Sequence, residues 1–457
     1  MTRNAWALGL VALALGCGKD DPVNPDAGTK PPDNDNTTSN FTQFVVDSGP
    51  SEFHQISSIA LAVGPEDRIG MAYFVRLNTQ TMNAPDFELR YREFNGGTLG
   101  PAETVAKVQR VYGVSLAFGP NGQPAVTYLG GVRDATSAED STFWYQSDLA
   151  VAYRSVNASG VGTWTERIAV RTSNQAATGN ALSDGGWLVG LNPSMVFSGN
   201  QALVAYRDGH RGNVGRQDWE ASDLELAVGG PTTWQHRMVT PGGDDKQGFG
   251  GHLSLIMAGT QPAVVHDTAP EAALASGSDV VFQRRNADGT TWTRPVKVQQ
   301  VGNTQLGASM AYDATVGFGI AVLSRTDNRL TYIDCAETTA TKCAAAGDWS
   351  TPDPVYNSGT GGWYPSLAFD PVNHEPSIAY YICALESGRN DTSCNTGDDK
   401  LVVATRVGGV RWNEELVDAG GGWSPKLAYL SNGKRIVLYR APAVASDSGV
   451  LKLSVEK

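Results

Sequence analysis

Long apolar segments, nucleotide-binding motifs and metal-ligand motifs are scarce in this chain of 457 residues. After residue 17, no segment approaches the roughly 20 apolar residues that a membrane-spanning helix needs. No Walker motif, Rossmann glycine fingerprint or HExxH motif occurs, and no two cysteines have the CxxC spacing. These absences argue against a transmembrane domain and against P-loop, Rossmann and zincin chemistry. We therefore predict no metal and no cofactor.

Positive charge is also in short supply. The chain carries 35 Lys and Arg residues against 47 Asp and Glu residues, which gives a formal net charge of −12. A protein that binds nucleic acid needs a basic stripe or patch on its surface. The acidic balance therefore argues against a nucleic-acid partner.

Cysteine is rare, with five residues in the whole chain. Apart from Cys17, the cysteines form two close pairs, Cys335 with Cys343 and Cys383 with Cys394. Each pair flanks a loop between two predicted strands, where a disulfide forms readily in an oxidising compartment. The cysteines therefore predict two disulfides and an exported protein.

The chain is rich in one repeated pair of short strands. The clearest copy is GGWYPSLAFDPVNHEPSIAYY at 361–381, where apolar residues alternate with period two on both sides of a turn. Seven copies occur, at spacings of 55 to 79 residues. Equivalent positions in these copies are Ala62, Ala117, Val196, Ile256, Ala311, Ala368 and Ala428. A recurrence of this size, with several short strands in each unit, is typical of a β-propeller.

Two more strands follow each repeated pair. The third strand is exemplified by FELRYREF from Phe87, and the fourth often opens with a Trp. These strand-opening residues, which we expect to pack between blades, are Trp164, Trp234, Trp292, Trp349 and Trp412. Four strands make one propeller blade. We therefore predict an all-β fold over residues 41–457, a seven-bladed β-propeller of four-stranded blades.

The two ends of this domain are predicted to share one blade. After Arg440 only one strand remains, at 451–455, so the seventh blade lacks its outer strand. The segment FTQFVVDSG from Phe41 matches WNEELVDAG from Trp412 at its aromatic, Val, Asp and Gly positions. We predict that this N-terminal strand pairs as the outer strand of the C-terminal blade and closes the propeller, which removes an open sheet edge.

The N-terminus has the features of an exported, lipid-anchored protein. Residues 1–17, MTRNAWALGLVALALGC, combine a basic Arg3, an apolar run and small residues, as a secretory signal does. The ending ALGC resembles a bacterial lipobox, which implies acylation of Cys17; an unmodified cysteine inside a signal core is the alternative. Residues 18–40 are rich in Pro, Asp, Asn and Thr, which predicts a disordered tether.

The residue after the lipobox bears on localisation. Gly18, rather than Asp, resembles lipoproteins that Gram-negative bacteria sort to the outer membrane. We therefore expect an outer-membrane lipoprotein, facing the periplasm or the cell surface. Its expected membrane contact is the lipid anchor alone, and we expect a monomer.

The two faces of the predicted propeller differ in their loops. Loops between second and third strands are long, for example after Leu129, Tyr206 and Ile382, whereas turns between first and second strands are tight. Arg171 to Asn192, which joins the second blade to the third, is also long. Long loops inside a compact domain are usually functional. We therefore predict a ligand site on the loop-rich face.

Aromatic and basic side chains gather on this predicted face. Aromatic rings suit sugars because they offer flat apolar area, and Arg suits carboxylates because it binds them with two hydrogen bonds. Packing of the aromatic rings and ordinary salt bridges of the arginines are the alternatives. The residues predicted to bind a ligand are Arg133, Trp144, Trp187, Arg207, Arg211, Trp219, His252, His266, Trp363 and Trp423.

Two histidines form a further candidate cluster. A two-residue turn at Gly259-Thr260 would pair Leu253 with His266 and His252 with Asp267. This register places both imidazoles and the Asp267 carboxyl together at the mouth of the fourth blade. They could move protons or hold a metal, or form a local polar cluster without chemistry.

The repeat GWYPSLAFDP…PSIAYY resembles the repeats of secreted bacterial propeller proteins and, more distantly, the sialidase superfamily. The resemblance covers most of residues 40–457 and implies the propeller fold. The Arg cluster on one face is similar to a sialidase site. Sialidases carry Asp-box turns, S-x-D-x-G-x-T-W; the nearest match here is NADGTTW, in which Asp288 lies one residue closer to Trp292.

Three classes of function remain open at this point. The first is a surface-anchored module that binds glycans or another extracellular ligand. The second is a glycoside hydrolase or lyase, which would need two carboxylates about 5–9.5 Å apart. The third is a scaffold that binds proteins. The loop residues that qualify as catalytic acids are Asp134, Asp208, Asp218, Glu220 and Asp267.

Overall fold

The structure is a computed structural model. It describes residues 39–50, 59–77, 85–134, 145–157, 162–171, 188–209, 221–240, 247–270, 279–300, 308–324, 329–336, 342–357, 361–382, 400–409, 411–441 and 448–457. The chain divides into two units, Met1–Asp35 and Asn36–Lys457, and all described residues lie in the second. Within the described part of the chain, no helix has the length and apolar character needed to cross a membrane.

Asn36–Lys457 is built from β-strands that follow one another in antiparallel groups. The first group is β2 (Ile59–Val63), β3 (Ile69–Arg76), β4 (Phe87–Asn95), β5 (Thr98–Leu99) and β6 (Glu103–Val108). The second is β7 (Val114–Phe118), β8 (Pro124–Asp134), β9 (Tyr145–Val156) and β10 (Gly162–Val170). The third is β11 (Leu188–Ser198), β12 (Gln201–Gly209), β13 (Ala221–Gly229) and β14 (Trp234–Thr240).

The later groups repeat this order. The fourth is β15 (Gln247–Ala258), β16 (Gln261–Pro270), β17 (Asp279–Arg284) and β18 (Val296–Gln300). The fifth is β19 (Ala308–Asp313), β20 (Gly317–Ser324), β21 (Arg329–Cys335) and β22 (Asp353–Tyr356). The sixth is β23 (Gly361–Phe369), β24 (Pro376–Ile382), β25 (Lys400–Val407) and β26 (Arg411–Asp418). The seventh is β27 (Trp423–Tyr429), β28 (Arg435–Ala441), β29 (Ser448–Glu456) and β1 (Phe41–Pro50).

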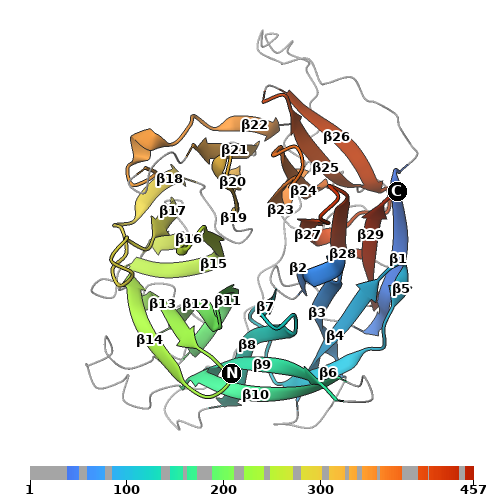
Figure 1. Cartoon of the computed structure of the whole chain (residues 1–457), viewed down its shortest axis with the longest axis vertical. Helices are drawn as coiled ribbons and strands as arrows, with labels where there is room; N and C mark the ends of the chain where they lie inside the picture. Colours follow the sequence, from blue (N-terminus) through green and yellow to red (C-terminus); the bar gives the residue numbers. More distant parts are fainter. Residues whose placement is uncertain are drawn as a thin grey trace, which may run out of the picture. The chain divides into compact units, whose positions relative to one another are not determined.

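The first strands of successive groups lie side by side (Figure 1). The order of contact is β2, β7, β11, β15, β19, β23 and β27, and β27 also lies against β2. Apolar side chains fill the junctions between groups; Leu438 of β28, for example, packs in one cluster with Ile59 of β2 and Met71 of β3. Because each group buries its apolar faces against the groups before and after it, the arrangement is that of a β-propeller.

The hydrogen-bonded sheets differ from the seven separate sheets that the sequence predicts. Among the described residues, the second, third and fourth groups join into one sheet of 12 strands, through parallel bridges between β9 and β11 and between β13 and β15. The joins arise because β11 and β15 begin early. Their first residues, Leu188 and Gln247, run beside Ser147 and Ala221 before the strand turns to its own partner.

The N-terminal strand pairs as predicted. β1 runs antiparallel to β29, with Phe41 opposite Glu456 and a bulge between Val45 and Asp47. Phe41 and Val46 are buried, at 4% and 1% exposure. The match between FTQFVVDSG and WNEELVDAG therefore identified the strand that completes the sheet β27-β28-β29.

Two further predictions from the sequence are confirmed. Cys335 and Cys343 form a disulfide with an S–S distance of 2.09 Å; the predicted pair Cys383 and Cys394 lies outside the described residues. The strand-opening tryptophans pack in apolar clusters at the junctions between groups. They are Trp164, Trp234, Trp292, Trp349 and Trp412.

Candidate functional site

Four of the first strands begin with a backbone bulge. In each, the pairing with the second strand slips over the same stretch, for example between Gly251 and Ser254. Each bulge contains one non-glycine residue with φ between 42° and 55°, a region that such residues adopt rarely. These residues are Asn192, His252, Tyr364 and Ser424. Because strained positions and bulges cluster at functional sites, this end of the sheets is a candidate site.

His252 lies in one of these bulges and is hydrogen-bonded to Asp267. Its Nδ1 is 2.9 Å from Oδ2 of the carboxyl, and the two side chains are 13% and 2% exposed. The predicted proximity is therefore present. The predicted register is wrong, because Gly251 rather than His252 stands opposite Asp267. The two-residue turn at Gly259-Thr260 is as predicted. The bulge releases His252 from the ladder and turns its side chain onto the carboxyl.

The dyad has the arrangement of an oriented general base. A carboxylate on Nδ1 fixes the ring and its tautomer, and it stabilises the imidazolium that forms when Nε2 takes up a proton. Burial raises the pKa of Asp267. Its Oδ1 has no hydrogen-bond partner among the described residues. The described residues contain no group of three His, Cys, Asp or Glu side chains able to hold a metal ion.

His266 plays a different part from the one predicted. The ring is fully buried, Nδ1 lies 3.2 Å from the amide of Gly250, and Nε2 lies 3.2 Å from Oε1 of Gln283. Burial lowers the pKa of His266 to about 4, so the ring stays neutral at physiological pH. Both nitrogens are engaged inside the protein, which favours a role in positioning the strand start around Gly250 over contact with a ligand.

The predicted arginines and acids of this face are largely internal. Arg207 is 5% exposed and donates from Nε to Oγ of Ser222 over 2.8 Å. Asp208 is fully buried and stands opposite Asp223 of β13. Arg440 is 6% exposed and lies over the Trp423 ring at 4.9 Å. The hydrogen bond of Arg207 to Ser222 and the packing of Arg440 on Trp423 favour internal roles over contact with a ligand.

Trp363 and Trp423 share one buried cluster. They are 6% and 8% exposed and pack with Tyr364, Tyr381 and Leu323. Rings buried to this extent offer a sugar little area to stack on, which favours the packing alternative for both.

The remaining predicted site residues are not placed by the structure. The backbone of Arg133 and Asp134 belongs to β8, and nothing is described of their side chains. Asp208 and Asp267 are thus the described members of the predicted acid set. The predicted residues that lie outside the described part of the chain are Trp144, Trp187, Arg211, Asp218, Trp219 and Glu220.

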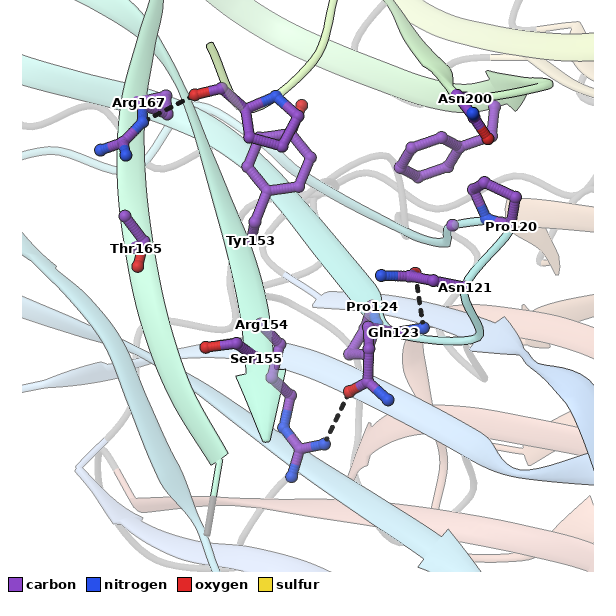
Figure 2. A pocket seen from close by; sticks show the side chains of 13 residues that line it. Pro120, Asn121, Gln123, Pro124, Tyr153, Arg154, Ser155, Thr165, Arg167 and Asn200 are labelled. Atoms are coloured by element: carbon purple, nitrogen blue, oxygen red, sulfur yellow. Dashed lines mark hydrogen bonds between the residues drawn. The ribbon is translucent and has the colours of Figure 1, made fainter. Parts of the chain in front are cut away.

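A pocket lies at the opposite end of the sheets, between the second and third groups (Figure 2). It has a volume of about 430 Å³, which is within the range of small-molecule sites. Its walls come from the turn between β7 and β8, the paired strands β9 and β10, and the turns of the third group. The apolar wall residues are Pro120, Pro124, Tyr153, Phe197 and Pro231.

The charged side chains of the pocket are already neutralised or engaged. Arg154 donates two hydrogen bonds to the Glu103 carboxylate, at 2.9 and 2.6 Å, and a third to Oε1 of Gln123 at 3.4 Å. Arg167 donates from Nε to the carbonyl of Pro231 over 2.8 Å (Figure 2). Arg154 is therefore paired with a carboxylate, whereas Arg167 donates to a neutral carbonyl and keeps its positive charge.

Uncharged polar groups complete the lining. The Tyr153 hydroxyl is buried without a hydrogen-bond partner among the described residues, and burial raises its pKa to about 12. The Asn121 amide oxygen accepts from the backbone N–H of Gln123 at 3.0 Å, which directs the amide group of Asn121 at the pocket (Figure 2). Asn200 enters from the third group. Flat apolar walls with neutral donors and acceptors suit a polyhydroxylated ring.

Sequence reasoning missed this pocket. The predicted ligand site was on the loop-rich face, whereas this pocket is built from tight turns. One signal was present: prolines and amides cluster in GPNGQP at 119–124, the turn that forms one wall. The opposite wall, Tyr153 and Asn200, comes from residues that only the packing of two strand groups brings together.

No family model and no curated protein matches the chain. Several solved structures do match the chain. A mutant of NanB sialidase from Streptococcus pneumoniae is 11% identical, with 90% of this chain and 70% of that chain covered and a TM-score of 0.46. The GH93 α-L-arabinofuranosidase of Fusarium graminearum is 11% identical, with 92% and 97% covered and a TM-score of 0.46. A leech intramolecular trans-sialidase is 12% identical, with 91% and 70% covered and a TM-score of 0.44.

Proposed function

We propose that this protein binds a neutral saccharide, or the neutral part of a glycan, in the pocket between the second and third strand groups. The observation that carries the proposal is the chemistry of the lining. Both arginines are satisfied internally by Glu103 and backbone carbonyls, while the buried hydroxyl of Tyr153 has no partner among the described residues. Because that hydroxyl is covered, the side chain must shift on binding for a sugar hydroxyl to supply the partner; the sugar ring packs on Phe197 and the prolines.

Binding is expected to weaken when this hydroxyl is removed. Tyr153→Phe keeps the ring and loses one hydrogen bond, worth about 1 kcal/mol, so affinity for the recognised glycan should fall roughly fivefold. A glycan array on the purified full-length protein identifies the ligand, and calorimetry then compares the variants.

Tyr332→Phe is the matched control. The Tyr332 hydroxyl is equally buried and without a partner among the described residues, but it belongs to β21, outside the pocket. This variant should bind like the parent. Equal affinities of the parent and both variants would show that the Tyr153 hydroxyl does not contact the ligand, and would contradict the proposal.

We also propose that the strand groups form a closed propeller of seven blades, each of four strands apart from the short extra strand β5 in the first group. Three contacts support closure: β27 lies against β2, β1 pairs with β29, and one apolar cluster joins Leu438 to Ile59. The parallel bridges between neighbouring groups are compatible with this proposal, because they involve only the strand ends.

We propose an outer-membrane lipoprotein anchored through Cys17, a residue outside the described part of the chain. The sequence ALGC followed by Gly18 supports this assignment. Several acyl chains on one cysteine anchor a protein stably, whereas a single chain is marginal. The 23 residues of 18–40 would then tether a monomeric domain at the membrane surface.

Replacing Cys17 by Ser should abolish lipid attachment completely. The variant should accumulate as the uncleaved precursor and incorporate no labelled palmitate, because the acylated thiol and the processing site are both lost. Gel mobility and radiolabel in whole cells measure both effects. Label retained by the variant would place the anchor elsewhere.

A glycoside hydrolase or lyase on the loop-rich face is the second candidate. The oriented pair of His252 and Asp267 is the observation that favours it. A panel of fluorogenic glycosides tests it: turnover that is lost in His252→Ala, Asp208→Ala or Glu220→Ala would establish an enzyme. A protein that neither binds glycans nor turns them over would instead fit the third candidate, a scaffold for protein partners.

A further inference from the structure

A repeated hydrogen bond joins a serine on the first strand of one group to the backbone of the first strand of the next group. At five successive junctions the serine hydroxyl accepts a hydrogen bond from a backbone N–H of the following first strand, at 2.9 to 3.4 Å. The donor and acceptor pairs are Met195 with Ser115, Leu255 with Ser194, Met310 with Ser254, Leu367 with Ser309, and Leu427 with Ser366.

The series is interrupted at two junctions. The residue at the serine position, two before the repeat anchor, is Lys426 in β27 and Ala60 in β2. By the same register, the Cβ of Lys426 is expected beside the N–H of Leu61 in β2, and that of Ala60 beside the N–H of Leu116 in β7. Neither side chain offers an acceptor to that N–H. The chain has therefore replaced a neutral acceptor by a cation at one position and by a methyl group at the next.

The N–H of Leu61 points away from its own sheet. Gly64 donates its N–H to the carbonyl of Arg68 at 2.8 Å, and hydrogen-bonded pairs alternate along an antiparallel ladder. Ala62 and Ala60 are therefore the bonded residues opposite β3, and Leu61 directs its N–H toward β27. This donor lies on the strand that packs against β27.

The described strands that pack against β27 carry no anionic side chain. β27 is packed against β2, β23, β24 and β28, and none of these five strands contains an Asp or a Glu. The side chain keeps partial exposure, yet its surroundings desolvate it, which lowers the pKa of Lys426 to about 8. An ammonium with no hydrogen bond or ion pair among the described residues is costly, and a bound anion would compensate it.

We propose that the junction between β27 and β2 is a site for a small oxyanion or carboxylate, held by the Lys426 ammonium and the Leu61 N–H. Lysine supplies the charge and the backbone amide supplies direction, as in anion sites built from main-chain donors. The site is independent of the saccharide pocket, which lies at the turns of the second and third groups.

Binding should be linked to proton uptake. At pH 8.5 a large fraction of Lys426 is neutral in the free protein, and an oxyanion that binds the charged form draws a proton onto it. The other titratable groups on the surrounding strands are arginines and tyrosines, whose ordinary pKa values lie at about 10 or above. They are Tyr364, Tyr380, Tyr381, Tyr429, Arg435, Tyr439 and Arg440.

Calorimetry on the full-length protein tests the proposal, with acetate, sulfate and phosphate as probes at constant ionic strength in chloride. Titrations at pH 8.5 in two buffers of different ionisation enthalpy measure the protons taken up. We expect saturable binding of at least one probe with uptake of a fraction of a proton, and about tenfold or greater weakening in Lys426→Ser.

The serine variant restores the residue that five other strands carry, so it should fold, and its hydroxyl oxygen should accept a hydrogen bond from the Leu61 N–H. If Lys426→Ser does not fold, Lys426→Met replaces it in the same titrations. Lys434→Ser, which removes an exposed lysine from the β27–β28 turn, is the matched control and should bind like the parent. Absence of binding by the parent, or equal binding by the Lys426 and Lys434 variants, would overturn the proposal. Loss of saccharide binding in Tyr153→Phe leaves it untouched.

Discussion

Removal of residues 18–50 is expected to destabilise the domain by about 3–6 kcal/mol or to cause aggregation. The deletion takes away β1, whose Phe41 and Val46 are buried, and each buried side chain of this size contributes about 1.5–3 kcal/mol. It also removes Asp47, which accepts hydrogen bonds from the Tyr73 hydroxyl at 2.7 Å and from Arg90 at 3.1 Å. The edge of β29 would then be open to pairing with other molecules.

Removal of residues 18–38 is the control, because it spares β1. This shorter deletion should unfold like the parent in urea, whereas the longer one should unfold at lower urea concentration. Identical unfolding curves would show that β1 is dispensable, and the proposed closure of the seventh group would lose its main support.

The second large effect is expected at Arg435, where four strands meet. Its guanidinium bonds Glu456 of β29 and Glu415 of β26, and it lies over the Phe41 ring of β1 at 5.3 Å. The arginine side chain is 11% exposed and that of Glu456 is 17% exposed. Arg435→Met leaves two carboxylates close together without their cation, which should cost about 3 kcal/mol.

The cost should depend on pH. Burial alone would raise the pKa of Glu456, but the hydrogen bonds from Arg435 outweigh it and lower that pKa. A lowered pKa contributes stability that is present above the ordinary value of 4.5 and is lost as pH falls through the folded-state value. Parent and Arg435→Met should therefore differ most at neutral pH and converge in acid.

A double variant separates the ion pair from simple packing. Arg435→Met combined with Glu456→Gln removes one of the two stranded carboxylates, so part of the lost stability should return. Urea unfolding at pH 7 and pH 4 measures all three variants. A double variant as unstable as the sum of its single changes would show that the two residues act independently.

The two candidate sites lie at opposite ends of the sheets. At the bulged end, His252 and Asp267 form the oriented pair, while Trp363, Trp423, Arg207 and Arg440 are buried around the strand starts. At the turn end, Tyr153 and its neighbours line a pocket with neutral polar groups. Binding and any catalysis would therefore be affected by different substitutions, which makes the two proposed functions separable by experiment.

The sequence by itself determined the features that depend on local pattern. Period-two alternation located the strands, the match of FTQFVVDSG to WNEELVDAG identified the partner of β29, and the close spacing of Cys335 and Cys343 predicted their disulfide. A two-residue turn brought His252 and Asp267 together for the same reason, because the length of a hairpin loop sets which residues lie across from each other.

The tertiary structure decided what depends on packing between groups. The bulge that shifts His252 by one residue carries no local signal, because the same alternating residues are compatible with either register. Burial of Trp363 and Trp423 follows from neighbours far away in the chain. Tyr153 and Asn200 line one pocket, and the strand of Lys426 lies against the strand of Leu61, only because separate strand groups pack side by side. The same type of apolar or charged residue can lie in a core, in a pocket or at a junction between strand groups. Only its neighbours in the folded chain decide which of these environments it has.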